Sequence, residues 1–390
     1  MYLRELQLRN FRGHRHMELA FSPGVNLLFG VNGAGKSSVL DAASHALSYF
    51  RAKLFSKTAA GSEIKADEIT EGERSAIISA TLTGNGAEHP LLLCSTRKGF
   101  PKEQENNLRA AAAWAAPYME ARAAGTPVAY PLLAHYKAHR AIIDIPQRQA
   151  RIRDLGEPLS GYEQSLDGGG NFRSFFAWFR EMEDLENETS RDGHPGHRDY
   201  RSPELEAVRQ ALQAVLPGIT NIRIRRAHQA MVGTKNGVEI SVAQLSDGEK
   251  CYMALVGDIA SRLARLNVQK GYTAGQILNA PGIVLIDELD LHLHTRWQQE
   301  AIRKLPGIFP GIQFIITTHS LALVRELNLV QLERGADAPA VKYFSLYEEG
   351  EHGICVEAAE KLADLGHFHA AELHMEQDIK LLRHSGYELP

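Results

Sequence analysis

The sequence predicts an α/β fold built around a central parallel sheet. Two apolar runs, 283–288 (IVLIDE) and 312–320 (IQFIITTHS), are continuous rather than alternating, which is typical of parallel strands buried on both faces. A third run, 25–30, leads straight into a glycine loop and then into a helical pattern. Strands of this kind alternating with helices indicate an α/β architecture, with ligands expected at the carboxyl ends of the strands.

The N-terminal part of the chain predicts several strands and two helices. Residues 2–9 (YLRELQLR) alternate between apolar and polar side chains, as in a half-buried strand. Residues 73–100 predict two more strands, joined by a turn at GNGAEH. The other elements expected here are strands at 17–21 and 24–30 around the turn at Pro23 and Gly24, a helix at 36–50, an alanine-rich helix at about 107–123, and a buried strand at 130–136.

Residues 150–205 differ in character from the rest of the chain. Three glycines, an aromatic and acidic run and a polar stretch predict a helix with a mobile loop, inserted into the domain. The aromatic side chains are expected to pack in the core or under a lid, and an interaction surface is the alternative. They are Phe172, Phe175, Phe176, Trp178 and Phe179.

The C-terminal part begins with a helical pattern at 203–218. Asn236 and Gly237 then form a strong hairpin-turn signal. A long helix to about Asn267, the two buried strands and a closing hairpin at 341–359 complete the chain. We therefore expect three parts: an N-terminal lobe (1–150), a helical insertion (151–205) and a C-terminal lobe (206–390).

The composition is that of an ordinary globular protein. Its 390 residues suit about two domains, and a hydrophobic content of 44% can fill a core. A net charge of −4 argues against a general polyanion binder, because such affinity comes from Lys and Arg. Cys94, Cys251 and Cys355 are far apart, so neither a disulfide framework nor a zinc knuckle is predicted. No stretch approaches the roughly 20 apolar residues of a membrane helix, so we expect a cytoplasmic protein without membrane association.

Residues 30–37 (GVNGAGKS) match the P-loop pattern G-x-x-x-x-G-K-[ST], between a strand and a helix as the pattern requires. The glycines let the backbone curl, so that amide groups and the helix dipole face phosphate groups. Lys36 supplies a charge between the β and γ phosphates, and the Ser37 hydroxyl can bind Mg²⁺. The alternative is a glycine loop that only turns a corner.

Two acids and a histidine follow the buried strands. Asp287 is expected to hold Mg²⁺ through water, and Glu288 to orient and deprotonate an attacking water. His319 ends the next strand and is expected near the γ-phosphate. The alternatives are exposed acids after a buried strand and a histidine that only packs.

The segment QLSDGEK (244–250), called the signature segment below, predicts a second anion site. Ser246 and Glu249 have the spacing of a capping box, so a helix is expected to begin at Ser246. Gly248 keeps its amide approachable, and a helix N-terminus favours an anion. The alternative is a helix cap without a ligand.

The order NFRG, GVNGAGKSS, LSDGEK, IVLIDELDLHLH and TTHS resembles the ABC-type ATPases of the RecF, SMC and OLD group. This resemblance covers nearly the whole chain. It implies an ABC-ATPase head with a P-loop, a mixed central sheet, an antiparallel β subdomain and a helical insertion, with ATP and Mg²⁺ as cofactors. It also implies that the signature segment acts on ATP held by a second subunit, because one head cannot fold that helix onto its own P-loop if the two occupy separate lobes that face the same way.

The resemblance assigns roles to individual residues of this chain. Glu288 and His319 are implied to be catalytic, and Ser37 and Asp287 to hold the metal. The residues implied to bind the cofactor are Arg12, Asn32, Gly33, Ala34, Gly35, Lys36, Ser37, Ser38, Ser246, Gly248 and Lys250.

The chain departs from the family pattern at several positions. Asp247 stands where the signature usually has a glycine, although an acid suits the first turn of a helix. His294 stands where the loop after the acids usually has an aspartate, and Asp290 lies earlier. The glutamine loop of the family is not located, and its candidates are Lys137, His139, Arg140, Gln147 and Gln149.

The length and the LDLHLH variant resemble compact stand-alone members (AAA_21-like), as in Septu-like or retron-associated antiphage systems. No long coiled coil separates the two halves, and no nuclease domain is expected after His319. The three histidines of HFHAAELH (367–374) are expected to end a helix rather than to bind a metal. The leading hypothesis is therefore an ATP-dependent homodimer, or higher homo-oligomer, that senses and regulates a separate effector such as a nuclease.

The alternative hypothesis is a RecF-like DNA-binding ATPase in repair. Arg223 and Arg225 share one strand face, and an arginine cluster at 148–153 (Arg148, Arg151 and Arg153) could also contact phosphates. Charges on a solvated edge strand explain Arg223 and Arg225 equally well. A transporter subunit is a further, disfavoured possibility.

Overall fold

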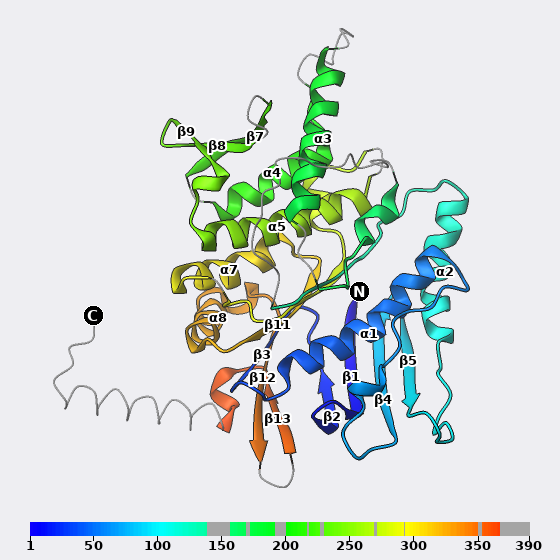
Figure 1. Cartoon of the computed structure of the whole chain (residues 1–390). Coiled ribbons are helices and arrows are strands. Elements are labelled where there is room, and N and C mark those ends of the chain that lie inside the picture. Colours follow the sequence, from blue (N-terminus) through cyan, green and yellow to red (C-terminus); the bar gives the residue numbers. More distant parts are fainter. Residues whose placement is uncertain are drawn as a thin grey trace, which may run out of the picture.

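The computed structural model describes residues 1–138, 157–168, 172–191, 200–216, 218–226, 230–268, 271–291, 293–349 and 353–366 (Figure 1). A mixed sheet lies at its centre, in the order β13-β12-β3-β11-β10-β6. All neighbours in it are parallel except β12 and β13. Its strands are β3 (Val25–Gly30), β6 (Leu132–Tyr136), β10 (Gly282–Ile286), β11 (Ile312–Thr318), β12 (Val341–Glu349) and β13 (Gly353–Ala359).

A second, antiparallel sheet has the order β2-β1-β4-β5. Its strands are β1 (Tyr2–Phe11), β2 (His14–Ala20), β4 (Ser75–Gly84) and β5 (Ala87–Thr96). The pairing of β1 with β4 shifts register between Leu3 and Glu5, so Leu3 and Leu6 are both buried although they are three positions apart. The simple alternation that the sequence predicts for 2–9 is therefore interrupted by this irregularity.

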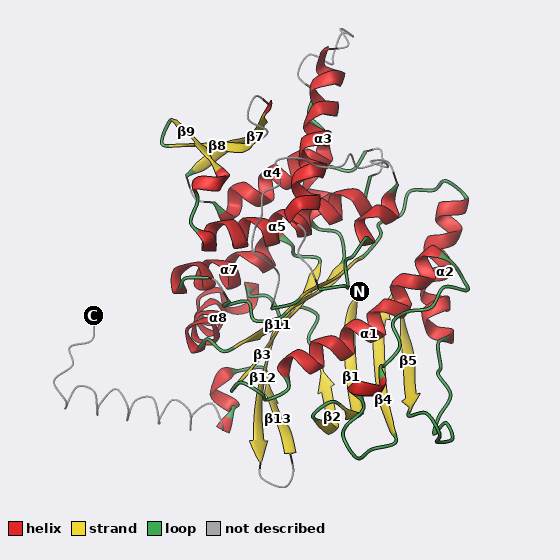
Figure 2. Ribbon diagram, viewed as in Figure 1, coloured by secondary structure: helices red, strands yellow, loops and turns green. Residues whose placement is uncertain are grey.

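Eight α-helices of the described chain surround these sheets (Figure 2). Helix α1 packs against strands of both sheets and so lies between them, while α4, α5, α7 and α8 pack on one another as a second group. The helices are α1 (Lys36–Phe55), α2 (Arg109–Ala123), α3 (Phe172–Arg191), α4 (Pro203–Val215), α5 (Asp247–Leu266), α6 (Ala274–Leu278), α7 (Thr295–Ile308) and α8 (Leu321–Arg334). None is both long and apolar enough to cross a membrane, among the residues described.

Helix α3 and a three-stranded sheet project from this body (Figure 1). The sheet consists of β7 (Ile219–Arg225), β8 (Ala230–Lys235) and β9 (Val238–Ser241). The predicted hairpin turn is confirmed, since Asn236 and Gly237 join β8 to β9 with φ values of 51° and 78°. The packing role predicted for the aromatic run is confirmed for Phe175, Phe176, Trp178 and Phe179, which are buried, and the side chain of Phe172 lies outside the described part of the chain.

The central strands are buried because of their composition. Every residue of β10 and β11 is buried, as expected of parallel strands covered on both faces. The predicted mixed central sheet, antiparallel sheet and closing hairpin are therefore confirmed. Strands β3, β10 and β11 lie side by side, so their carboxyl ends meet at one edge of the sheet.

Candidate nucleotide site

Lys36 lies at the centre of the edge where β3, β10 and β11 end. Its Nζ donates to the carbonyl oxygens of Gly30 (2.8 Å) and Val31 (2.9 Å) and lies 3.2 Å from Nδ1 of His319. Burial lowers the pKa of Lys36, and the nearby carboxylates, chiefly that of Glu288, oppose this effect. The structure thus brings the P-loop lysine and the predicted histidine together across 283 positions of sequence.

The P-loop has the backbone that phosphate binding needs. Gly33 and Gly35 have φ values of 84° and 75°, in the left-handed region that favours glycine. A Cβ atom at Gly35 would lie 2.5 Å from the ring of His14. Gly35 is also the N-cap of α1 and offers no side-chain acceptor to the first amides of the helix. An N-terminus of this kind fits a phosphate group.

The other predicted P-loop residues line the same turn. Asn32, Gly33 and Ser37 are exposed, whereas Ala34 is buried and Ser38 is half-buried. Of these residues, the exposed Asn32, Gly33 and Ser37 are therefore the ones that can contact a ligand directly.

Ser37 and Asp287 lie together beside the P-loop. The Ser37 hydroxyl donates to Oδ1 of Asp287 over 3.0 Å, and Asp287 is 6% exposed. A hydroxyl and a carboxylate are hard oxygen ligands of the kind that Mg²⁺ takes in P-loop proteins. The pair therefore fits the predicted metal, and its assignment stays a prediction.

Glu288 and His319 lie at the same edge of the sheet and contact each other. Nε2 of His319 lies 3.3 Å from Oε1 of Glu288. Nδ1 of His319 contacts both the Lys36 ammonium, which only donates, and the carbonyl oxygen of Gly30 (3.2 Å), which only accepts, whereas Nε2 faces the Glu288 carboxylate. The arrangement can orient a carboxylate that accepts a proton from water.

Sequence reasoning missed His14. Its side chain is fully buried, and Nε2 contacts the carbonyl oxygen of Gly35 at 3.0 Å. Burial lowers the pKa of His14. A neutral His14 donating through Nε2 would hold the last turn of the P-loop. The sequence signal that could have pointed to His14 was its position directly after the NFRG motif. No local pattern linked it to Gly35, which lies 21 positions away.

The signature segment begins α5 as predicted. Ser246 is the N-cap, its hydroxyl oxygen accepts from the Glu249 amide, and the Glu249 carboxylate accepts from the Ser246 amide, which confirms the capping box. Lys250 pairs with Asp247, and Gly248 is half-buried. The side-chain contacts of Ser246 and Lys250 are thus within their own helix turn.

Two further predicted residues contact acids. Arg12 pairs with Asp41 on α1 and with Glu68 on a short 3₁₀ helix (Ala66–Glu68), and Lys137 pairs with Asp41. The structure therefore places Arg12 against carboxylates one helical turn beyond Ser37. The remaining glutamine-loop candidates, the arginines at 148–153 and the histidines of 367–374 lie outside the described residues.

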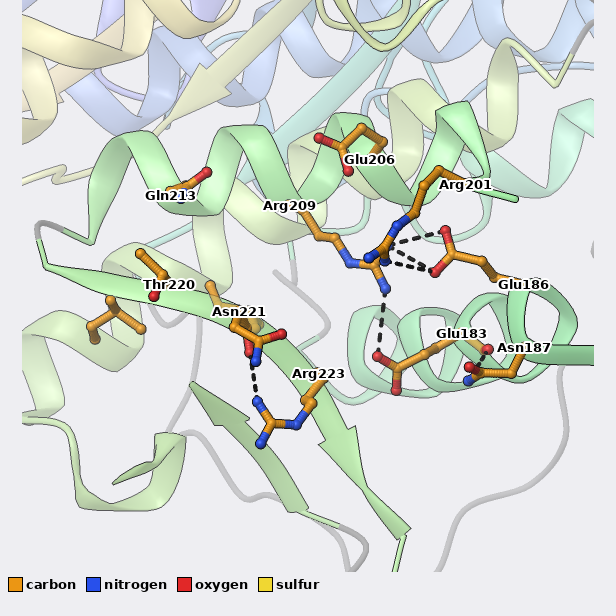
Figure 3. A pocket seen from close by; sticks show the side chains of 12 residues that line it. Glu183, Glu186, Asn187, Arg201, Glu206, Arg209, Gln213, Thr220, Asn221 and Arg223 are labelled. Atoms are coloured by element: carbon orange, nitrogen blue, oxygen red, sulfur yellow. Dashed lines mark hydrogen bonds and ion pairs between the residues drawn. The ribbon is translucent and has the colours of Figure 1, made fainter. Parts of the chain in front are cut away.

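A separate polar cavity of about 380 Å³ lies between α3, α4 and β7 (Figure 3). Four of its charged side chains pair with one another: Arg209 contacts Glu183 and Glu186, and Arg201 contacts Glu186. Burial raises the pKa of Glu183. This cavity contains none of the residues predicted for the nucleotide site.

Comparison with known proteins found a matching family and similar relatives. Residues 25–325 match the family described as "AAA domain, putative AbiEii toxin, Type IV TA system". The chain is 30% identical to the "Retron Ec83 probable ATPase" of Escherichia coli, over 81% of this chain and 68% of that protein. It is 26% identical to the "Septu protein PtuA" of Bacillus mycoides, over 84% of this chain and 39% of that protein.

One similar solved structure is an SMC head bound to the C-winged helix domain of ScpA. It has a TM-score of 0.52 at 14% identity, and the match covers 92% of this chain and 98% of the other. At this identity the likeness concerns the fold alone. It agrees with an α/β head of the ABC type.

Proposed function

The chain belongs to the AAA domain family described as putative AbiEii toxin, Type IV TA system, and from this membership we propose that it binds and hydrolyses ATP. One observation carries the proposal: five predicted site residues lie at one sheet edge, where Lys36 contacts His319, His319 contacts Glu288, and Ser37 contacts Asp287. The retron ATPase to which the chain is similar supports the same activity.

The roles of these side chains follow from their contacts. Lys36 exchanges the carbonyl oxygens of Gly30 and Val31 for phosphate oxygens and neutralises their charge. Glu288 accepts the proton of the attacking water, while the His319 ring, whose Nε2 lies 3.3 Å from Oε1 of Glu288, orients that carboxylate. Mg²⁺, held by Ser37 and Asp287, would neutralise charge on the phosphate oxygens.

We further propose that two copies close around ATP. In the three-part division proposed from the sequence, the P-loop lies in the lobe of residues 1–150 and the signature segment in the lobe of residues 206–390. Ser246, Gly248 and Lys250 would then meet the γ-phosphate held by the other copy. The exposed Ser246, at the N-terminus of a 20-residue helix, supports this role.

The assembled heads are proposed to regulate a separately encoded effector, such as a nuclease, in bacterial antiphage defence. The retron and Septu proteins to which the chain is similar support this setting. A cytoplasmic location is part of the same proposal.

A RecF-like role in DNA binding is the weaker candidate. It relied on Arg223 and Arg225, whose guanidinium groups both pair with Glu239 on β9. The pairing neutralises part of the charge that phosphate contacts would need. Salt-sensitive binding of duplex DNA that is lost on charge reversal of both arginines would favour this candidate instead.

The test is ATP binding and phosphate release by the purified chain and three variants. Lys36→Ala should bind ATP more weakly, because it loses the charge between the phosphates. Glu288→Gln should bind ATP normally but release phosphate about 10²- to 10⁴-fold more slowly, the usual contribution of a general base. The matched control Glu71→Gln, an exposed acid outside the site, should behave as the wild type. No ATP binding by the wild type, or full turnover by Glu288→Gln, would refute the proposal.

A further inference from the structure

Glu288 has a backbone conformation that needs support from its surroundings. Its φ value is 48°, in the left-handed region that few residues other than glycine adopt. Such conformations persist at functional sites only where neighbouring contacts determine them. The contacts that hold the flanking acids, Asp287 and Asp290, therefore bear on where the Glu288 carboxylate points.

Thr317 holds the N-terminal side of Glu288. Its buried hydroxyl donates to Oδ1 of Asp287 (2.6 Å) and accepts from the backbone amide of Glu288 (2.7 Å). The backbone carbonyl of Thr317 also accepts from the amide of Leu289 (3.0 Å). One residue of β11 thus fixes the backbone on both sides of Glu288.

Thr318 holds the C-terminal side. Its buried hydroxyl donates to Oδ1 of Asp290 (2.6 Å) and accepts from the amide of Ser320 (2.9 Å). Successive side chains of a strand point to opposite faces. The hydroxyls of Thr317 and Thr318 therefore contact the loop from Asp287 to Asp290 from opposite faces of β11. Glu288 lies between these two contacts.

Gln298 on α7 adds hydrogen bonds to this set of contacts. The Gln298 side chain donates to the carbonyl oxygen of Leu293 (2.8 Å) and accepts from the Ser320 hydroxyl (2.6 Å). The far end of the acidic loop is thereby joined to the residue that follows His319. Glu288 and His319 are consequently held by one connected set of hydrogen bonds.

We propose that Thr317 and Thr318 are positioning residues for hydrolysis, because their paired hydroxyl bridges fix Glu288 in its left-handed conformation and aim its carboxylate. Each hydroxyl joins a flanking acid to a backbone amide, which a valine methyl group cannot do. The inference rests on the proposed ATP hydrolysis and deepens it. In this inference two neutral residues, Thr317 and Thr318, orient the carboxylate of Glu288, which is the proposed base.

The test compares valine and serine variants of both threonines in the full chain. Thr317→Val and Thr318→Val should lower kcat about 10- to 100-fold, the cost of a small misplacement of a catalytic group. Affinity for ATP, measured by titration without turnover, should stay at the wild-type value in Thr318→Val, since the Thr318 hydroxyl bonds to Asp290 and Ser320 rather than to a predicted ATP- or metal-binding residue. Thr317→Ser and Thr318→Ser should restore kcat because they keep the hydroxyl.

The matched control is Thr83→Val. The Thr83 hydroxyl on β4 is buried without a hydrogen-bond partner in the part of the chain described, so its loss should leave kcat unchanged. Wild-type turnover in both valine variants would overturn the inference while leaving ATP hydrolysis intact. So would a serine variant that folds with wild-type thermal stability yet stays as slow as the valine variant. Absence of turnover in the wild type would instead remove the proposed function, and the inference with it.

Discussion

His135 is a fully buried histidine on β6, close to the nucleotide site. Neither ring nitrogen has a hydrogen-bond partner among the described residues. Burial lowers the pKa of His135 to about 4, with Lys137 and His45 acting in the same direction and Asp41 and Asp287 against it. The neutral ring is therefore the form that the folded protein accepts.

This pKa predicts a loss of stability in acid. Between pH 6.5 and about 4 the unfolded chain binds a proton at His135 and the folded chain does not, so stability falls as the pH falls through this window. The difference in pKa corresponds to about 3 kcal/mol. In denaturant titrations, the free energy of unfolding of His135→Leu should fall less than that of the wild type from pH 6.5 to 4. Parallel pH dependence in the two proteins would contradict the assignment.

At the scale of elements, α5 depends on its N-cap. Ser246→Asp keeps a side chain suited to the cap but adds a charge where a partner's phosphate is proposed to bind. Melting temperature and ATP affinity of the monomer should be preserved, whereas ATP-dependent pairing should be lost. Ser246→Asn, a neutral capping residue, serves as the control and should still pair. Equal pairing by the aspartate variant would argue against a role in trans.

Helix α5 is also fixed to β6 by buried charges. Asp258 accepts from Arg262 (2.7 Å) and from the Tyr136 hydroxyl (2.8 Å), and both charged side chains are at most 2% exposed. Removing one member of a buried pair costs about 3–5 kcal/mol, because the other charge is left uncompensated. Asp258→Ala should lower the free energy of unfolding by that amount.

The control for this prediction is the solvent-accessible pair Glu300–Lys304 on α7, which has the same i, i+4 spacing and side chains that are 29% and 32% exposed. Glu300→Ala should cost only about 0.3–0.5 kcal/mol, as measured for exposed helix pairs. If the two variants lost similar amounts of free energy of unfolding, burial of Asp258 would make no contribution to stability.

Elements with local signals could be predicted from the sequence. The P-loop, the capping box of Ser246 and the turn at Asn236 depend on residues a few positions apart, and all three are present in the structure. Contacts between distant segments could not be predicted. The contact of His14 with Gly35 and the bridge from Thr317 to Asp287 depend on which strands become neighbours in the sheets, and no local pattern encodes that.

At the scale of the whole molecule, the central claim is that ATP joins two copies. Within one chain, α5 packs mainly with α3, α4, α6 and α7, and α1 packs mainly with strands of the two sheets, although both helices also contact β6. The P-loop at the start of α1 and the signature segment at the start of α5 are thus carried by helices with largely different packing partners. A second copy is the proposed means of bringing them to one nucleotide.

The most direct test is the mass of Glu288→Gln in solution, measured by light scattering with and without ATP and Mg²⁺. Since this variant should bind ATP but not hydrolyse it, the mass should double on adding ATP and return to that of one chain when Lys36→Ala is also present. A mass of one chain at every ATP and protein concentration, together with wild-type turnover per chain that does not change on dilution, would contradict the account.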